Sequence, residues 1–200
     1  MENKKINVLL EMADDNDGYV SVSDAARFGI APTFISYLVE LGQLTRIAKG
    51  LYIKKGYEID RYYLLHYIYK KMVFGYESSL YLHGLISEPS IPDIVLPLNY
   101  MTKGIEGTLS RHLGNKEFQT GQILLVTPKG NLVPGYDLER LFIETIKRAD
   151  DLDKGTIVSR LTAIYSKGIY KDKLDEYAKA FHLEGEINLA IKLIGLDKLG

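Results

Sequence analysis

A β-hairpin pattern directly after two helical patterns is the feature that most limits the fold of this chain. Residues 42–55 read GQLTRIAKGLYIKK. Apolar side chains occur on both sides of the Lys49-Gly50 pair, at Leu44, Ile47, Leu51 and Ile53. Glycine tolerates the positive φ that a tight hairpin turn needs. The segment therefore predicts two antiparallel strands with their tip at Lys49-Gly50.

The patterns before the hairpin have clear beginnings and ends. Residues 6–13 place apolar side chains on one helical face, and the ADDNDG that follows consists of turn-forming residues. Tyr19-Val20 has the composition of a short strand. Ser21 and Asp24 have the spacing of a capping box, which satisfies free amides at the start of a helix. We expect this second helix to end at Gly29, because glycine suits a left-handed helix end.

A third helix is predicted after a three-residue turn. Pro32 suits its first turn, since a missing amide costs little there, and Gly42 ends it. The apolar side chains that mark its buried face are Phe34, Ile35, Leu38 and Leu41. The order helix, short strand, helix, turn, helix and hairpin is that of a winged helix-turn-helix, in which the third helix occupies the recognition position.

Positive charge is concentrated on the hairpin although the chain as a whole is not basic. The formal net charge is −1, and residues 1–60 contain 7 Lys+Arg and 9 Asp+Glu. A basic surface must therefore come from local segregation. We expect the hairpin cations to contact DNA phosphates, with help from Lys4 and Lys5, and polar residues of the third helix to face base edges in the major groove. The predicted DNA-binding residues are Thr33, Ser36, Tyr37, Arg46, Lys49, Lys54 and Lys55.

Beyond residue 58 the pattern changes, which predicts a winged-helix domain at 1–58 and a second domain at 59–200. Helices are predicted at 61–71, 78–85, 137–149, 154–166, 171–182 and 186–195. Strands are predicted at 91–98 and 122–128, which are dense in β-branched and leucine residues and bounded by proline or glycine. A third strand is predicted at 117–121. The whole chain is thus predicted to be α+β, with a small mixed sheet and a C-terminal helical group in the second domain.

Motifs for catalysis or metal binding are missing from the sequence. Cysteine is absent, which excludes disulfides and thiolate sites and fits a cytoplasmic location. No apolar run approaches the roughly 18 residues that cross a bilayer. The four histidines have no metal-ligand spacing, and no P-loop or nucleophile elbow occurs. Pro92-Asp93 could begin a nuclease motif, but no downstream acid has lysine two positions later. We expect no enzymatic activity, no metal and no cofactor.

Several segments together resemble a known family. The winged-helix pattern, SSLYLHGL (78–85), DIVLPL, LLVTP and YDLERLFIETIKR (136–148) resemble the AbiEi antitoxins, which are the transcription-repressor antitoxins of type IV AbiE phage abortive-infection systems. Members of that family usually have Glu-Arg-Thr-Leu where this chain has Glu139-Arg140-Leu141-Phe142.

The resemblance implies a protein with two tasks. The winged helix would repress its own operon by binding inverted repeats in promoter double-stranded DNA, as a monomer in solution that binds cooperatively and bends the DNA. The second domain would counteract a cognate nucleotidyltransferase toxin, AbiEii, without requiring a stable complex. No membrane partner is expected.

The second domain also has candidate residues for the antitoxin task. Glu139 lies in the first turn after a predicted N-cap at Asp137, where the helix dipole favours negative charge. Arg140 could pair with an acid across the domain or act directly. Cations on the C-terminal helices could form a second basic surface, or could simply be solvated. The antitoxin-domain candidates are Arg140, Arg160, Lys167, Lys171 and Lys173.

Two other classes of function stay open at the level of sequence. A winged helix also serves as a protein-docking module, with the second domain as a scaffold. Alternatively, the second domain could bind a small molecule and make the protein a ligand-sensing regulator. A gel shift on the protein's own upstream DNA tests the first alternative, and a thermal-shift screen tests the second.

Overall fold

The structure is a computed structural model that describes residues 2–100 and 105–195. The chain is α+β and divides into two compact units. The first unit comprises the residues up to Lys70 together with Val126–Asn131, and the second comprises Lys71–Leu125 and the residues from Leu132 onward. The domain boundary predicted between residues 58 and 59 stays a prediction. Within the described residues, no helix combines the length and apolar character that a membrane span requires.

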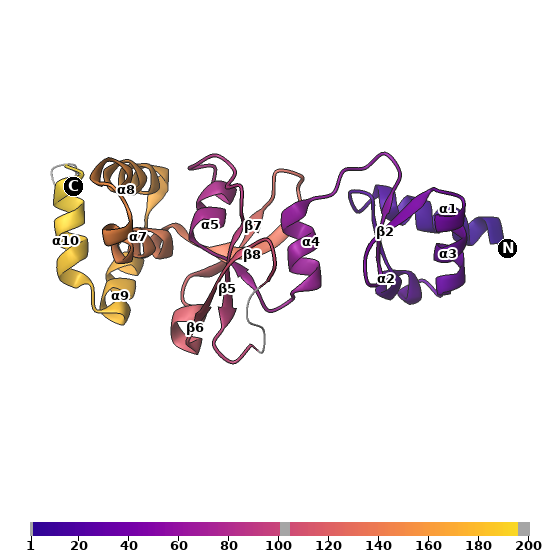
Figure 1. Cartoon of the computed structure of the whole chain (residues 1–200), viewed down its shortest axis with the longest axis horizontal. Helices are drawn as coiled ribbons and strands as arrows, with labels where there is room; N and C mark the ends of the chain where they lie inside the picture. Colours follow the sequence, from indigo (N-terminus) through magenta and orange to yellow (C-terminus); the bar gives the residue numbers. More distant parts are fainter. Residues whose placement is uncertain (1, 101–104, 196–200) are drawn as a thin grey trace. The chain divides into compact units, whose positions relative to one another are not determined.

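The first unit contains a winged helix-turn-helix followed by one more helix (Figure 1). Its elements are α1 (Glu2–Asp14), β1 (Tyr19–Ser21), α2 (Val22–Arg27), α3 (Pro32–Glu40), β2 (Leu44–Ala48), β3 (Leu51–Lys54) and α4 (Arg61–Ile68). The strands form an antiparallel sheet in the order β1-β3-β2. The hairpin tip lies where the sequence predicts it, with Gly50 at φ +74°.

Both faces of this small sheet are covered. On one face, Leu44 and Tyr52 pack into the core that α1, α2 and α3 form. On the other face, Leu51 and Ile53 pack against α4, where the Tyr63 ring lies 4.7 Å from the Tyr19 ring. The hairpin is therefore a supported edge of a packed unit, and its cations project from a fixed backbone.

A buried carboxylate explains why Val126–Asn131 belongs to the first unit. Asp60 is the N-cap of α4 and accepts hydrogen bonds from the amides of Tyr62 and Tyr63, at 3.0 and 3.1 Å. Its second oxygen accepts the Thr127 hydroxyl at 2.5 Å and the Asn131 side-chain amide at 3.0 Å. These four hydrogen bonds satisfy a charge that would otherwise be costly to bury.

The second unit joins two small sheets to a helical group. Its strands are β4 (Val73–Phe74), β5 (Asp93–Pro97), β6 (Leu109–Leu113), β7 (Gln122–Val126) and β8 (Leu132–Tyr136). Its helices are α5 (Tyr76–Leu82), α6 (Asn115–Gln119), α7 (Leu138–Lys147), α8 (Lys154–Gly168), α9 (Lys171–Phe181) and α10 (Glu184–Leu193), with a 3-10 turn η1 (Ala149–Asp151). One sheet is mixed, in the order β4-β5-β6 with β5 and β6 parallel, and β7 pairs with β8.

Helix α7 is the centre of the helical group. Figure 1 shows α8, α9 and α10 gathered around it, and its contacts include all three. Leu141, Phe142 and Ile143 are fully buried in the common core. Asp137 caps the helix as predicted, because its side chain accepts the Arg140 amide at 2.8 Å.

Three details of the sequence prediction are wrong. Residues 117–121 do not form a strand: Asn115–Gln119 is the short helix α6, whose Phe118 packs on the core, and the chain turns at Gly121 with φ +82°. Leu41 is 53 % exposed and not buried, because it is the C-cap residue of α3 and lies beyond the helical face that packs. The prediction also missed β4, which has only two residues, β6, which has no β-branched residue, and β8, which has one.

The SSLYLHGL motif has a structural role in this fold. Ser78 Oγ accepts the Asp93 amide at 2.8 Å, and Ser79 Oγ accepts the Tyr136 amide at 3.0 Å. His83 Nε2 lies 2.9 Å from the Tyr136 carbonyl oxygen, and burial lowers the pKa of this histidine. The motif thus ties α5 to β5 and β8 through side chains that satisfy buried backbone groups.

Candidate nucleic-acid interface

The exposed side of α3 carries the three residues predicted to face bases. Thr33, Ser36 and Tyr37 are all exposed, and Tyr37 is 47 % exposed. Ile35 and Leu38 on the opposite side are buried in the core of the unit. The helix therefore has an accessible polar face of hydroxyl groups held on a rigid element, which is what base-edge contacts in a groove require.

Three of the predicted cations are exposed on or beside the hairpin next to α3, and one of them, Arg46, donates from its Nε to the Ala48 carbonyl at 3.3 Å. Arg46 shares the α3-facing side of the sheet with Leu44, and β2 contacts α3. Lys49 is exposed at the hairpin tip. The Lys55 amide donates to the Gln43 carbonyl at 2.9 Å, which places Lys55 just beyond the end of α3. We call Arg46, Lys49 and Lys55 the wing cations. Among the residues that the structure describes, no carboxylate pairs with any of them.

Lys54 differs from the wing cations because an acid already binds it. Its ammonium lies 2.5 and 2.7 Å from the two oxygens of Asp14 at the end of α1. The Tyr57 hydroxyl donates to the same carboxylate at 2.9 Å. The hydrogen bonds from Lys54 and then Tyr57 lower the pKa of Asp14. The prediction that Lys54 contacts phosphate is thus weakened, since its charge is compensated within the unit.

A further cation lies beside the start of α3. The Lys5 ammonium is 5.2 Å from the centre of the Phe34 ring, so α1 places a positive charge along the flank of α3. Arg27 at the end of α2 is paired with Asp24 at 3.2 Å. Glu40 is exposed in the last turn of α3 and opposes phosphate binding there.

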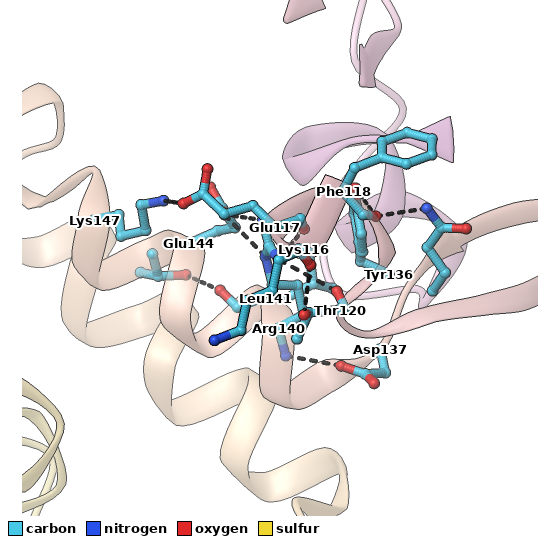
Figure 2. Close-up of polar contacts among 12 residues, drawn as sticks. Lys116, Glu117, Phe118, Thr120, Tyr136, Asp137, Arg140, Leu141, Glu144 and Lys147 are labelled. Carbon is cyan, nitrogen blue, oxygen red and sulfur yellow. Dashed lines mark hydrogen bonds and ion pairs between the residues drawn. The ribbon is translucent and has the colours of Figure 1, made fainter. Parts of the chain in front are cut away.

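Among the antitoxin-domain candidates, Arg140 is the most deeply buried. Its side chain has no exposed surface, and it donates to the carbonyls of Glu117 and Thr120 at 2.6 and 3.2 Å. Its Nε also donates to Glu144 at 3.0 Å (Figure 2). The guanidinium carbon, Cζ, lies 4.4 Å from the centre of the Phe181 ring. Arg140 therefore joins α6 to α7, and we assign it a structural role in place of the direct role considered from the sequence.

Two further candidates are held by carboxylates. Arg160 binds both oxygens of Glu77, at 2.9 and 3.2 Å, and donates to the Tyr76 hydroxyl. Lys173 lies 2.9 Å from Asp137 and 3.5 Å from Glu139. Although burial opposes its charge, these two acids together raise the pKa of Lys173. Only Lys167 and Lys171 of the candidate set are exposed and unpaired among residues 2–100 and 105–195.

Sequence reasoning missed a second cluster of charges around Asp93. This carboxylate has no exposed surface and pairs with Arg111 from β6, while Arg148 at the end of α7 lies 3.9 Å away. Asp93, Arg111 and Arg148 are far apart in the sequence, so no spacing rule identifies them together. In the described part of the chain, no group of three or more His, Asp and Glu side chains is arranged to hold a metal ion.

Comparison with known proteins finds a match to one family model and a similar fold among solved structures. Residues 7–53 match the model of a family described as transcriptional regulators, AbiEi antitoxin. No curated protein matches the chain. Among solved structures, the crystal structure of the RV2827C protein from Mycobacterium tuberculosis is similar, with a TM-score of 0.59 and 15 % identity over 94 % of this chain and 80 % of that one. At this identity the likeness concerns the fold alone.

The family match begins within α1 and ends at Ile53 in β3, so it includes β1, α2, α3 and β2 of the candidate interface, while Lys5 and Lys55 lie outside it. It supports a role as an antitoxin or transcriptional regulator. The resemblance to the AbiEi antitoxins noted from the sequence is thereby confirmed for residues 7–53, which are similar to the AbiEi antitoxin transcriptional regulators.

Proposed function

We propose that the protein is a type IV antitoxin that represses its own toxin-antitoxin operon. In this proposal α3 enters the major groove of promoter DNA at inverted repeats, and the hairpin contacts the flanking phosphates. The second unit counteracts a nucleotidyltransferase toxin without needing a stable complex with it. Binding by single chains that cooperate on adjacent half-sites would supply sequence specificity that one headpiece lacks.

The observation that carries the proposal is the exposed, unpaired state of the wing cations beside α3. Arg46, Lys49 and Lys55 occupy the hairpin and its end, and the exposed hydroxyls of α3 lie on the helix that contacts β2. Phosphate contacts from such cations position a protein on DNA, while groove contacts select the sequence. The negative overall charge does not oppose this, because binding depends on local charge within a Debye length of roughly 8–10 Å.

Fluorescence anisotropy with a duplex from the protein's own upstream DNA tests the repressor part. The wild-type chain should bind this duplex more tightly than a scrambled one. The triple variant Arg46→Gln, Lys49→Gln, Lys55→Gln should flatten the slope of log K against log salt by about 2.7, since each lost phosphate contact is worth about 0.9.

A matched control removes three charges elsewhere. Lys71, Lys116 and Lys192 are exposed lysines of the second unit, and their triple replacement by glutamine should leave the slope unchanged. Equal slopes for wild type and the wing variant would remove the hairpin from the DNA interface and favour the protein-docking alternative.

Co-expression with a nucleotidyltransferase encoded beside this protein tests the antitoxin part. The wing triple variant should lose repression of a promoter fusion and still restore growth, because neutralisation is assigned to the second unit. Loss of both activities in a variant that is as stable as wild type would show that neutralisation depends on DNA binding. If the wild-type chain fails to restore growth, the toxin assignment is wrong.

A further inference from the structure

A small cavity in the second unit has four cations in its lining, together with tyrosine rings, aliphatic side chains and one acid. Its volume is about 200 Å³, and its charged lining comes from β6 and α7. Three of the lining cations are partly exposed: Arg111, Lys147 and Arg148. The rest of the lining consists of the Tyr76 and Tyr136 rings, the aliphatic side chains of Val95 and Leu113, and Glu144. We call this cavity the arginine pocket. Arg140 lies in its wall without exposed surface.

The charges around the arginine pocket do not balance. Lys147 is paired with Glu117 at 3.1 Å, and Arg140 with Glu144 at 2.8 Å. Arg111 and Arg148 share a single carboxylate, because both approach Oδ2 of Asp93. Four cations therefore face three carboxylates, and the excess positive charge lies at the two arginines that share Asp93.

Arg148 is the side chain whose bonding is incomplete. The distance of 3.9 Å from its Nη1 to Asp93 Oδ2 is too long for a hydrogen bond. This nitrogen is buried and has no hydrogen-bond partner in the part of the chain that the structure describes. The guanidinium stacks on the Tyr76 ring, 4.6 Å from its centre. Stacking occupies the face of the guanidinium and leaves its in-plane N–H groups for an acceptor.

From this geometry we infer that the arginine pocket binds the phosphate group of a small phosphorylated molecule. Arginine forks match the spacing of phosphate oxygens, and the resulting hydrogen bonds are charge-assisted. Three partly exposed cations around one cavity suit a group with three anionic oxygens better than a carboxylate with two. A volume near 200 Å³ lies below the roughly 300–1,000 Å³ of sites for drug-sized ligands, so the pocket admits a phosphate with a small organic part.

The inference concerns the second unit alone and stands whether or not the first unit binds DNA. It gives the ligand-sensing alternative a physical site, with Arg111 and Arg148 as the binding residues and Tyr76 as the residue that orients Arg148. The excess charge at Arg148 costs stability in the unoccupied protein, so binding of an anion should also stabilise the fold.

Isothermal titration of the full chain with inorganic phosphate, at constant ionic strength set by chloride, tests the inference. We expect saturable binding at one site, and weaker binding of acetate. Arg148→Gln should weaken phosphate binding about tenfold or more, which corresponds to the loss of about one charge-assisted interaction. Arg148→Lys, which keeps the charge and loses the fork, should be intermediate. Lys192→Gln, an exposed lysine of α10, should bind as the wild type does.

Competition separates the two possible sources of the phosphate. Glycerol 3-phosphate should displace inorganic phosphate if the source is a free metabolite, and a 5′-phosphorylated tetranucleotide should do so if the source is the end of a nucleic acid. Either result supports a phosphate site, provided that Arg148→Gln weakens the displacement as it weakens phosphate binding. Three outcomes would overturn it: no saturable phosphate binding, equal binding by Arg148→Gln and wild type, or equal competition by the 5′-hydroxyl tetranucleotide.

Discussion

On the β2–β3 hairpin, Arg46, Lys49 and Lys55 are exposed and meet no carboxylate among the described residues. In the second unit, by contrast, Arg140, Arg160 and Lys173 each lie within 3.0 Å of a carboxylate oxygen. The two regions use the same residue types in opposite ways. These three hairpin cations stay exposed and without a carboxylate, whereas these three cations of the second unit join its own elements.

The difference follows from where each side chain lies relative to the core. A cation that is removed from water needs an opposite charge and hydrogen-bond acceptors. The buried cations of the second unit are therefore paired with carboxylates. A cation on a hairpin edge keeps its hydration and needs no partner. Lys54 is intermediate, because its side chain is 25 % exposed and Asp14 lies within reach.

The largest expected effect is the loss of stability on replacing Arg140. Arg140→Met would leave Glu144 and the carbonyls of Glu117 and Thr120 without their donor. Breaking a buried pair in this way should lower the free energy of unfolding by about 3–5 kcal/mol. Urea denaturation of the full chain measures it, with Lys192→Met as the control, for which a change within about 0.5 kcal/mol is expected. A similar small change for Arg140→Met would refute its structural role.

Tyr37 offers a test of sequence recognition. If its side chain contacts a base edge, Tyr37→Ala should reduce discrimination at one base pair by about 1–3 kcal/mol and leave other positions unaffected. Competition binding with a set of singly substituted operator duplexes measures this. A uniform loss of affinity across the whole set would place Tyr37 against the backbone and not against a base.

The contrast between Arg46 and Lys54 can be measured as a salt dependence. Arg46→Gln should flatten the slope of log K against log salt by about 0.9, because one phosphate contact is lost. Lys54→Gln should change the slope less, since Asp14 already compensates its charge. Asp14→Asn should release Lys54 and steepen the slope. Equal effects of the two glutamine variants would mean that DNA competes successfully with Asp14 for Lys54.

The smallest effect is expected from the pH dependence of the Asp14 cluster. The pKa of Asp14 is lowered in the folded chain by Lys54 and Tyr57, so the unfolded chain binds the proton more readily. The stabilisation is therefore present above the ordinary carboxyl pKa near 3.9 and is lost as pH falls through the lowered value. Thermal unfolding of wild type and Asp14→Asn should differ above pH 4 and converge at lower pH. A difference that persists at the lowest pH would contradict this cause.

Local patterns predicted much of the first unit. The Ser21 cap is seen in its hydrogen bond to the Asp24 amide at 2.9 Å, and Gly29, Gly42 and Gly50 all have positive φ where the helix ends and the hairpin tip were predicted. These features depend on residues within a few positions of one another. The same holds for Asp137 at the start of α7.

The second unit was less predictable because its strands are short and pair with distant segments. β4 has two residues, Val73 and Phe74, and exists only because β5 lies beside it. Residues 109–113 contain arginine and histidine, yet form β6 through parallel pairing with β5. Neither segment has a strand pattern of its own, so tertiary pairing decided its conformation.

By itself the amino-acid sequence determined the order of helices and hairpin in the first unit, the residues that cap them, and the placement of Arg46, Lys49 and Lys55 on the hairpin and at its end. These are short-range properties, set by turn and capping chemistry within single segments. The tertiary structure decided which cations are free. Lys54 meets Asp14 across 40 positions, and Arg111 and Arg148 meet at Asp93 from different elements. Electrostatic pairing depends on distance in space, which the spacing of residues along a chain does not reveal.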